Sequence, residues 1–193
     1  MAKSTRGTTA RSEQIRVLVL CTGNSARSIL AEALINHLGA GRFQAHSAGS
    51  TPAGRVNPFA QRVLEEHGIP AVGLRSKSWD EFAAAGAPAM DIVITVCDNA
   101  AGESCPLWPG TPVRVHWGLP DPAAVTGTEQ QKLNAFRDTF RRMKTRVQRL
   151  VAMRDPLHEN RQLEAELKRI HIEAPSDDGT RGQAPDNSTR GQA

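Results

Sequence analysis

A short apolar segment that runs through a glycine-containing turn into a helix-like segment sets the strongest constraint on the fold. Residues 15–20, IRVLVL, have the apolar and β-branched composition of a strand buried on both faces. After the turn, Leu30, Leu34 and Leu38 recur every four residues, and Gly39 provides a helix stop. A strand followed by a helix that crosses back over the sheet favours parallel strands.

The same alternation of strand and helix continues along the chain. Further strands are expected at 43–49, 91–97 and 113–117. Asn57, followed by proline, predicts the start of a helix, and a long helix with one apolar stripe is expected from Thr128.

A short helix is expected between these two, near Trp79 and Phe82. Ser78 and Glu81 have the spacing of a capping box for its first turn.

We therefore expect one α/β domain over residues 15–152, with a four-stranded parallel sheet flanked by helices. Residues 1–14 are expected to be a disordered lead. Residues 153–193 are expected to form a short, mostly polar helix and then a disordered tail that contains TRGQA twice.

The charge distribution and composition exclude several classes of partner. The net charge of +4 comes largely from basic residues near the two ends, and the chain has five Phe, three Trp and no Tyr, so we expect no nucleic-acid partner. No run of eighteen apolar residues is present, so we expect no membrane span. The N-terminal segment lacks the apolar core of a secretory signal, which favours a cytoplasmic protein and leaves only a short transit peptide as an alternative.

The three cysteines, Cys21, Cys97 and Cys105, favour reactive thiols over a structural disulfide framework. Their number is odd, their spacing is wide, and the chain has no secretion signal.

The turn after the first strand, CTGNSARS at residues 21–28, has the composition of a loop that binds an oxyanion. Gly23 and Asn24 tolerate the backbone angles of an anion-binding nest, and the following helix N-terminus adds positive potential. Arg27 can grip two oxygens of a tetrahedral anion, and Ser28 can donate a hydrogen bond to the sulfur of Cys21. The expected oxyanion ligands are Thr22, Gly23, Asn24, Ser25, Ala26 and Arg27.

Cys21 is the expected nucleophile in this loop. A cysteine beside a helix N-terminus and a cation has a lowered pKa, so we expect Cys21 to be a thiolate. The alternative is an inert cysteine at a strand end, which the glycine, serine and arginine that follow it disfavour.

Five segments together resemble a known family. CTGNSARS after an apolar strand resembles the phosphate loop of the low-molecular-weight tyrosine phosphatases. Residues 15 to about 152 resemble the thioredoxin-coupled arsenate reductases of that superfamily. The other matching segments are HSAG (46–49), NP (57–58), VITVCDNAAGESCP (93–106) and HWGLPDPA (116–123).

The resemblance implies reduction of arsenate to arsenite, with Cys21 attacking the bound oxyanion and Asp121 acting as general acid. It implies a first disulfide between Cys21 and Cys97, and a second between Cys97 and Cys105 that an external thiol reduces. Thioredoxin, glutaredoxin or glutathione could supply that thiol, and no organic cofactor or catalytic metal ion is expected.

Four alternatives stay open at this point. Cys97 and Cys105 could be inert, or could join His116 in a metal site, although their spacing is wider than zinc sites use. The chain could instead be a phosphatase, which the absence of tyrosine after Asp121 disfavours, or a sensor without catalysis, which would need no general acid.

Two positions depart from the family pattern. Many relatives carry a further cysteine where this chain has Ala26, and the interval from Cys97 to Cys105 is one residue longer than in the best-known members. The second departure bears on the identity of the electron donor more than on the reaction.

Some relatives hold a potassium ion beside the loop, and Asn24, Glu32 and Ser47 match three of its ligand positions. Counting without gaps from residue 57, two further ligand positions fall on Arg75 and Lys77. We expect the ammonium of Lys77 to offset the charge of Glu32 in place of potassium. The alternative is that Arg75 and Lys77 merely point to solvent.

Overall fold

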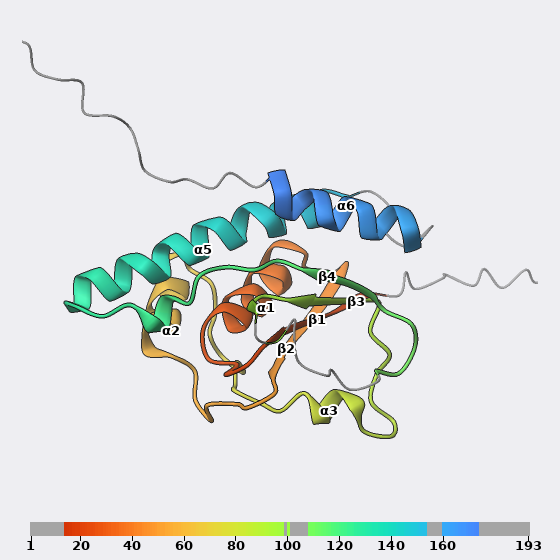
Figure 1. Ribbon diagram of the computed structural model, residues 1–193, viewed down its shortest axis with the longest axis horizontal. Coiled ribbons are helices and arrows are strands. Elements are labelled where there is room, and N and C mark those ends of the chain that lie inside the picture. The colour runs from red at the N-terminus through yellow and green to blue at the C-terminus, as the bar shows by residue number, and fades with distance from the viewer. Residues whose placement is uncertain (1–13, 99, 101–107, 154–159, 174–193) are drawn as a thin grey trace, which may run out of the picture.

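A computed structural model describes residues 14–98, 100, 108–153 and 160–173. In this part of the chain four strands form one parallel sheet in the order β2-β1-β3-β4 (Figure 1). The strands are β1 (Ile15–Cys21), β2 (Phe43–Gly49), β3 (Ile92–Thr95) and β4 (Val113–His116). The predicted fold class is confirmed, with β3 and β4 shorter at their ends than the sequence pattern indicates.

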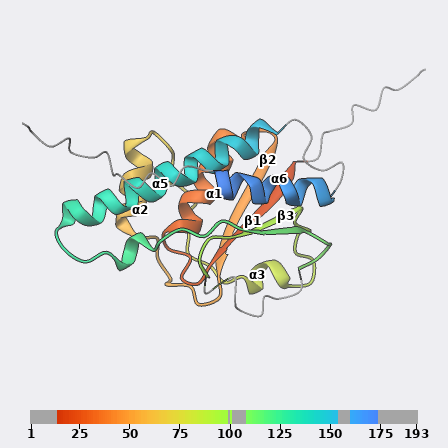
Figure 2. The same ribbon diagram turned by 45° about the horizontal axis from the view of Figure 1, so that its top comes forward.

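The helices form layers on both sides of the sheet (Figure 1). They are α1 (Arg27–Leu38), α2 (Pro58–Glu66), α3 (Asp80–Ala83), α5 (Glu129–Ala152) and α6 (Asn160–Glu173), with a 3-10 turn η1 at Pro122–Ala124. Figure 2 shows α5 lying over α1, and α3 covers the opposite face of the sheet.

Strand β1 is buried on both faces, as its continuous apolar run predicts. Val17 and Val19 belong to the larger core cluster, which α1, α5 and α6 complete. Leu18 and Leu20 belong to a smaller cluster with Phe82 of α3. All four residues are fully buried.

The residues predicted to cap the helix N-termini do so in α2 and α5 but not in α3. The Asn57 side chain accepts the Phe59 N–H at 2.9 Å, and Thr128 forms a capping box with Gln131. The capping box predicted for the short helix is wrong, because Ser78 accepts the Asp80 N–H.

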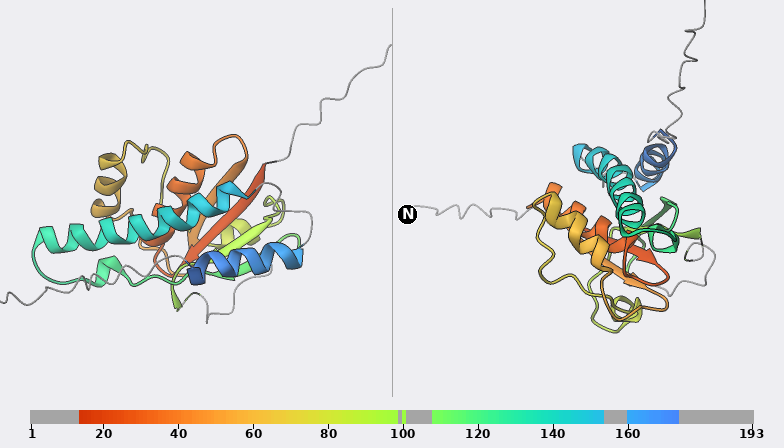
Figure 3. Two further views of the ribbon diagram at one scale, coloured as in Figure 1. Left: turned by 90° about the horizontal axis from the view of Figure 1, so that it is seen from above. Right: turned by 90° about the vertical axis from the view of Figure 1, so that its left-hand side faces the viewer.

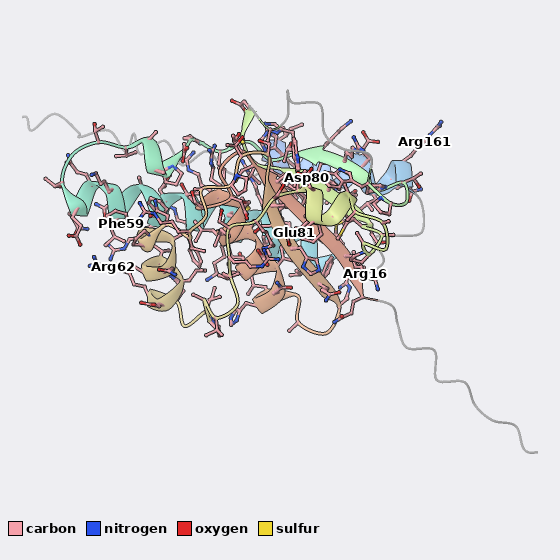
Figure 4. The ribbon with its side chains drawn as sticks, turned by 90° about the horizontal axis from the view of Figure 1, so that it is seen from below. Arg16, Phe59, Arg62, Asp80, Glu81 and Arg161 are labelled. Atoms are coloured by element: carbon pink, nitrogen blue, oxygen red, sulfur yellow. The ribbon has the colours of Figure 1, made fainter. Side chains whose placement is uncertain are left out.

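Glu81 binds Arg75 instead of reaching back to Ser78. Figure 4 views the molecule from the α3 side and labels Asp80 and Glu81 on this helix.

Helix α6 packs into the larger core beside β4. Its apolar residues Leu163, Leu167 and Ile170 are buried there, and the Trp117 indole N–H donates to the Leu167 carbonyl at 2.9 Å. Seen from above in Figure 3, α5 and α6 run beside each other across the strands.

No helix in the described part of the chain has the length and apolarity needed to cross a membrane. The predicted disordered ends, including both TRGQA segments, lie outside the described residues.

Candidate active site

The loop between β1 and α1 turns its carbonyl groups outward and its N–H groups inward. Backbone N–H groups of the segment 51–57 bind three of its carbonyls: Thr51 N to Thr22 O at 3.0 Å, Ala53 N to Gly23 O at 2.9 Å, and Asn57 N to Ser25 O at 2.9 Å. Because the N–H of a trans peptide points opposite to its carbonyl, the N–H groups that follow face the side of Cys21. The loop therefore presents a row of donors to one point, as an anion cradle requires.

Asn24 and Gly49 make this tight loop possible. Asn24 has a φ of 42°, in the left-handed region that the sequence analysis expects of it. A Cβ atom on Gly49 would lie 2.3 Å from the Thr22 carbonyl oxygen, so only glycine allows β2 to end against the loop. The sequence gives no sign of this role for Gly49 beyond its place in the HSAG segment.

Cys21 lies at the base of the cradle and is 4% exposed. Its Sγ is 2.9 Å from the Ser28 hydroxyl and accepts the Asn24 N–H at 3.1 Å. Burial raises the pKa of the Cys21 thiol, and the hydrogen bonds with Ser28 and Asn24 lower it by less. The predicted lowering of this pKa is therefore wrong for the protein without substrate.

Arg27 and Asp121 meet across the mouth of the cradle. Arg27 Nη2 lies 3.0 Å from Asp121 Oδ2, and Arg27 Nη1 donates to the Leu119 carbonyl at 2.9 Å. Arg27 Nε is buried and makes no hydrogen bond within the described residues, so this donor is free for an oxyanion. With its charge directed at Asp121, Arg27 does not offset the effect of burial on Cys21.

Cys97 lies beyond the end of β3 and lines a cavity of about 740 Å³ together with Thr22, Gly23 and Arg27 of the loop. Its Sγ is 3.6 Å from the Thr22 hydroxyl and accepts the Ala100 N–H at 3.4 Å. The electrostatic interaction with Cys97 adds a smaller contribution that also raises the pKa of Cys21. Both are free thiols, and Cys105 lies outside the described residues.

His116 lines the same cavity and is held by two neighbours. Its Nδ1 is 2.9 Å from the Thr95 hydroxyl, and its Nε2 is 3.1 Å from Asp98 Oδ1. Within the described residues no group of three or more His, Cys, Asp or Glu side chains could hold a metal ion. The sequence analysis missed Asp98, which no local pattern distinguishes from an ordinary exposed carboxylate.

Comparison with known proteins identifies the family. The model of the low molecular weight phosphotyrosine protein phosphatase family matches residues 16–168. The chain belongs to that family.

Two relatives of this chain carry the name of a different enzyme, arsenate reductase. An arsenate reductase of Halalkalibacterium halodurans is 38% identical over 121 residues, which cover 63% of this chain and 84% of that protein. The crystal structure of an arsenate reductase from Archaeoglobus fulgidus superposes with a TM-score of 0.56 at 30% identity, over 71% of this chain and 99% of that one.

A third relative is a thioredoxin-dependent arsenate reductase of Corynebacterium glutamicum. Its TM-score is 0.50 at 28% identity, over 71% of this chain and 63% of that one.

In this member of the phosphatase family, a buried ion pair supports the loop from behind. Lys77 Nζ lies 3.2 Å from Glu32 Oε2, with side-chain exposures of only 5% and 10%. Glu32 also accepts from the Ser47 hydroxyl, and Ser47 accepts from the Asn24 side-chain amide at 2.8 Å. Asn24 in turn donates to Ser28 at 2.9 Å, which connects the ion pair to the hydroxyl beside Cys21.

The position of Lys77 agrees with the expectation that its ammonium offsets Glu32. Lys77 Nζ also donates to the Arg75 carbonyl at 3.3 Å, so it fills the space between the oxygens that would ligate potassium. These residues do not fit a potassium ion, because the ammonium would repel it. The side chain of Arg75 pairs with Glu81 at the surface and makes no hydrogen bond or ion pair with Glu32 or Lys77.

Replacing Ser28 with alanine should raise the pKa of Cys21 further, because the hydrogen bond to Ser28 stabilises the thiolate. The measurement is the rate of iodoacetamide alkylation against pH in a background that lacks the other two cysteines. The inflection should move to higher pH in Ser28→Ala and stay in place in Ser25→Ala. An unchanged or lower inflection in Ser28→Ala would contradict the assigned hydrogen bond.

Replacing Lys77 with alanine should lower the free energy of unfolding by about 3 kcal/mol, because it leaves Glu32 buried without its counter-charge. The matched Arg75→Ala removes an exposed pair and should cost less than about 1 kcal/mol. Urea unfolding measures the free energy of unfolding of both variants.

The wild-type melting temperature should not change when sodium replaces potassium at constant ionic strength, because the ammonium of Lys77 occupies the place of the metal ion. A clear rise with potassium would show that the site takes the metal.

Proposed function

We propose that this chain reduces arsenate to arsenite, using Cys21 as nucleophile and Cys97 and Cys105 as a thiol relay. The observation that carries this proposal is the Cys97 thiol, which lines one cavity with Thr22, Gly23 and Arg27 of the loop and lies 3.6 Å from the Thr22 hydroxyl. A phosphatase needs the cradle, the arginine and the acid, but has no use for a second thiol there. The names of two relatives, both arsenate reductases, support the same choice.

The first step joins Cys21 to arsenic. The loop N–H groups and Arg27 bind the oxyanion, which takes Arg27 from its resting partner Asp121. Because Cys21 starts as a thiol, its proton passes to the bound arsenate dianion, the nearest base in the cradle. Sγ then attacks arsenic and an As–O bond breaks. Asp121, which takes up a proton from solvent after Arg27 has left it, donates that proton so that the oxygen leaves as water.

The second step moves two electrons to arsenic. Cys97 attacks Sγ of Cys21 as a thiolate, the new S–S bond forms, and the electron pair of the S–As bond stays on arsenic. Arsenic passes from the +5 to the +3 state and leaves as arsenite. Cys105 then attacks Cys97, which gives a Cys97–Cys105 disulfide and frees Cys21 for another cycle.

An external thiol must reduce the final disulfide. We propose thioredoxin as that donor, because one structural relative is thioredoxin-dependent, with glutaredoxin or glutathione as the alternatives to be compared. Such a cycle needs a reducing compartment, which favours the cytoplasm.

Hydrolysis of phosphate esters is the second candidate function, because the family and the cradle fit it equally. It would need no more than Cys21, Arg27 and Asp121. A slow reaction with an activated aryl phosphate is expected under either function, so that assay does not decide between them.

Arsenate-dependent loss of NADPH in the presence of thioredoxin and its reductase tests the proposal. Wild type should turn over, Cys105→Ser should complete one cycle and stop with Cys21 joined to Cys97, and Cys97→Ser should release no arsenite. Mass spectrometry of the trapped disulfides identifies each species. No oxidation with any of the three thiol systems would contradict the function, and a main Cys21–Cys105 bridge in wild type would reverse the order of the relay.

A further inference from the structure

A buried arginine interrupts the apolar stripe of α5. Met143, Val147 and Leu150 on the same side of this helix are fully buried, and Arg146 among them is only 6% exposed. Arg146 has no carboxylate partner within the described ranges. Burial, followed by the nearby Arg142, lowers the pKa of Arg146 to about 10, so it stays charged at neutral pH.

The Arg146 guanidinium binds the backbone at the start of the segment that carries Asp121. Its Nη1 donates to the Trp117 carbonyl at 2.7 Å and to the Gly118 carbonyl at 3.2 Å. Stability alone gives little reason for a charge at this position, because replacing buried ionic groups with apolar side chains of similar size is often neutral or favourable.

The segment from Trp117 to Asp121 is thus held by arginines at both ends. Arg146 holds the carbonyls at its start, and Arg27 holds Leu119 and Asp121 at its end. An oxyanion that binds Arg27 through its free Nε and through Nη2 takes this cation from the Asp121 side chain. The contacts of Arg146 with the two carbonyls lie away from this exchange and remain in place.

We propose that Arg146 is a positioning residue for Asp121, keeping residues 117–121 in place once the oxyanion has engaged Arg27. The proposal rests on the general-acid role given to Asp121 above. Arg146 acts at a distance from the reacting atoms, through the backbone, and does not itself bind the oxyanion. Its loss should therefore lower the rate of the chemical step and leave oxyanion affinity unchanged.

A double-mutant cycle tests this role, with single-turnover arsenite release at saturating arsenate as the rate. Asp121→Asn should lower this rate by about 10²–10⁴-fold, because it removes the general acid. Arg146→Met should lower the rate by about tenfold in the wild-type background, because small displacements of a catalytic group slow the chemical step. In the Asp121→Asn background the same change should lower the rate by less than about twofold. Arg146→Lys, which can still reach one carbonyl, should recover part of the loss.

Three further measurements separate positioning from general damage. The dissociation constant for phosphate should stay within about twofold of wild type in Arg146→Met. Hydrogen exchange of the 117–121 amides should be faster with phosphate bound in Arg146→Met than in wild type. Arg149→Met, which removes an exposed arginine one turn along the same helix, should change none of these values.

An equal loss from Arg146→Met in both backgrounds, or unchanged exchange at 117–121, would overturn the role of Arg146. A normal rate in Asp121→Asn would instead overturn the acid role of Asp121, and the exchange data would then decide whether Arg146 holds the segment. If Arg146→Met does not fold, the same cycle with Arg146→Lys gives the answer.

Discussion

The pairing of β1 with β3 brings two thiols to one edge of the sheet. Leu20 lies opposite Thr95, and the Val96 N–H donates to the Leu20 carbonyl at 2.9 Å. Beyond this pair, β1 ends in Cys21 and the chain after β3 reaches Cys97. Because parallel strands end at the same edge, Cys97 lines a cavity together with Thr22 and Gly23, the residues that follow Cys21. A register shift of one residue would turn one thiol to the other face of the sheet and separate the pair.

In this structure the charged side chains around the loop are paired with one another. Burial favours the neutral thiol of Cys21, Arg27 is paired with Asp121, and Lys77 is paired with Glu32 behind the loop. In the proposed mechanism, an incoming oxyanion takes Arg27 from Asp121 and accepts the proton of Cys21. Both changes would prepare the first step, because the first frees Asp121 to act as the acid and the second creates the nucleophile.

The fold and the loop could be predicted from the sequence because their signals are local. The IRVLVL run, the Asn57 cap and the spacing of Cys21 and Arg27 each lie within a few residues of what they determine. The direction of the Cys21 pKa could not be predicted, since it depends on how completely the folded chain buries the sulfur. Arg146 was missed because its partners, carbonyls 28 and 29 residues away, exist only in the folded chain.

The proposal that arsenate takes its two electrons from thiols of the chain itself can be tested without an external electron donor. Fully reduced protein is mixed with excess arsenate, and arsenite and free thiols are counted after denaturation. The chain has three cysteines, and one turnover should yield about one arsenite per chain and leave about one thiol. Three remaining thiols with no arsenite formed would contradict the relay and return the chain to phosphate-ester hydrolysis.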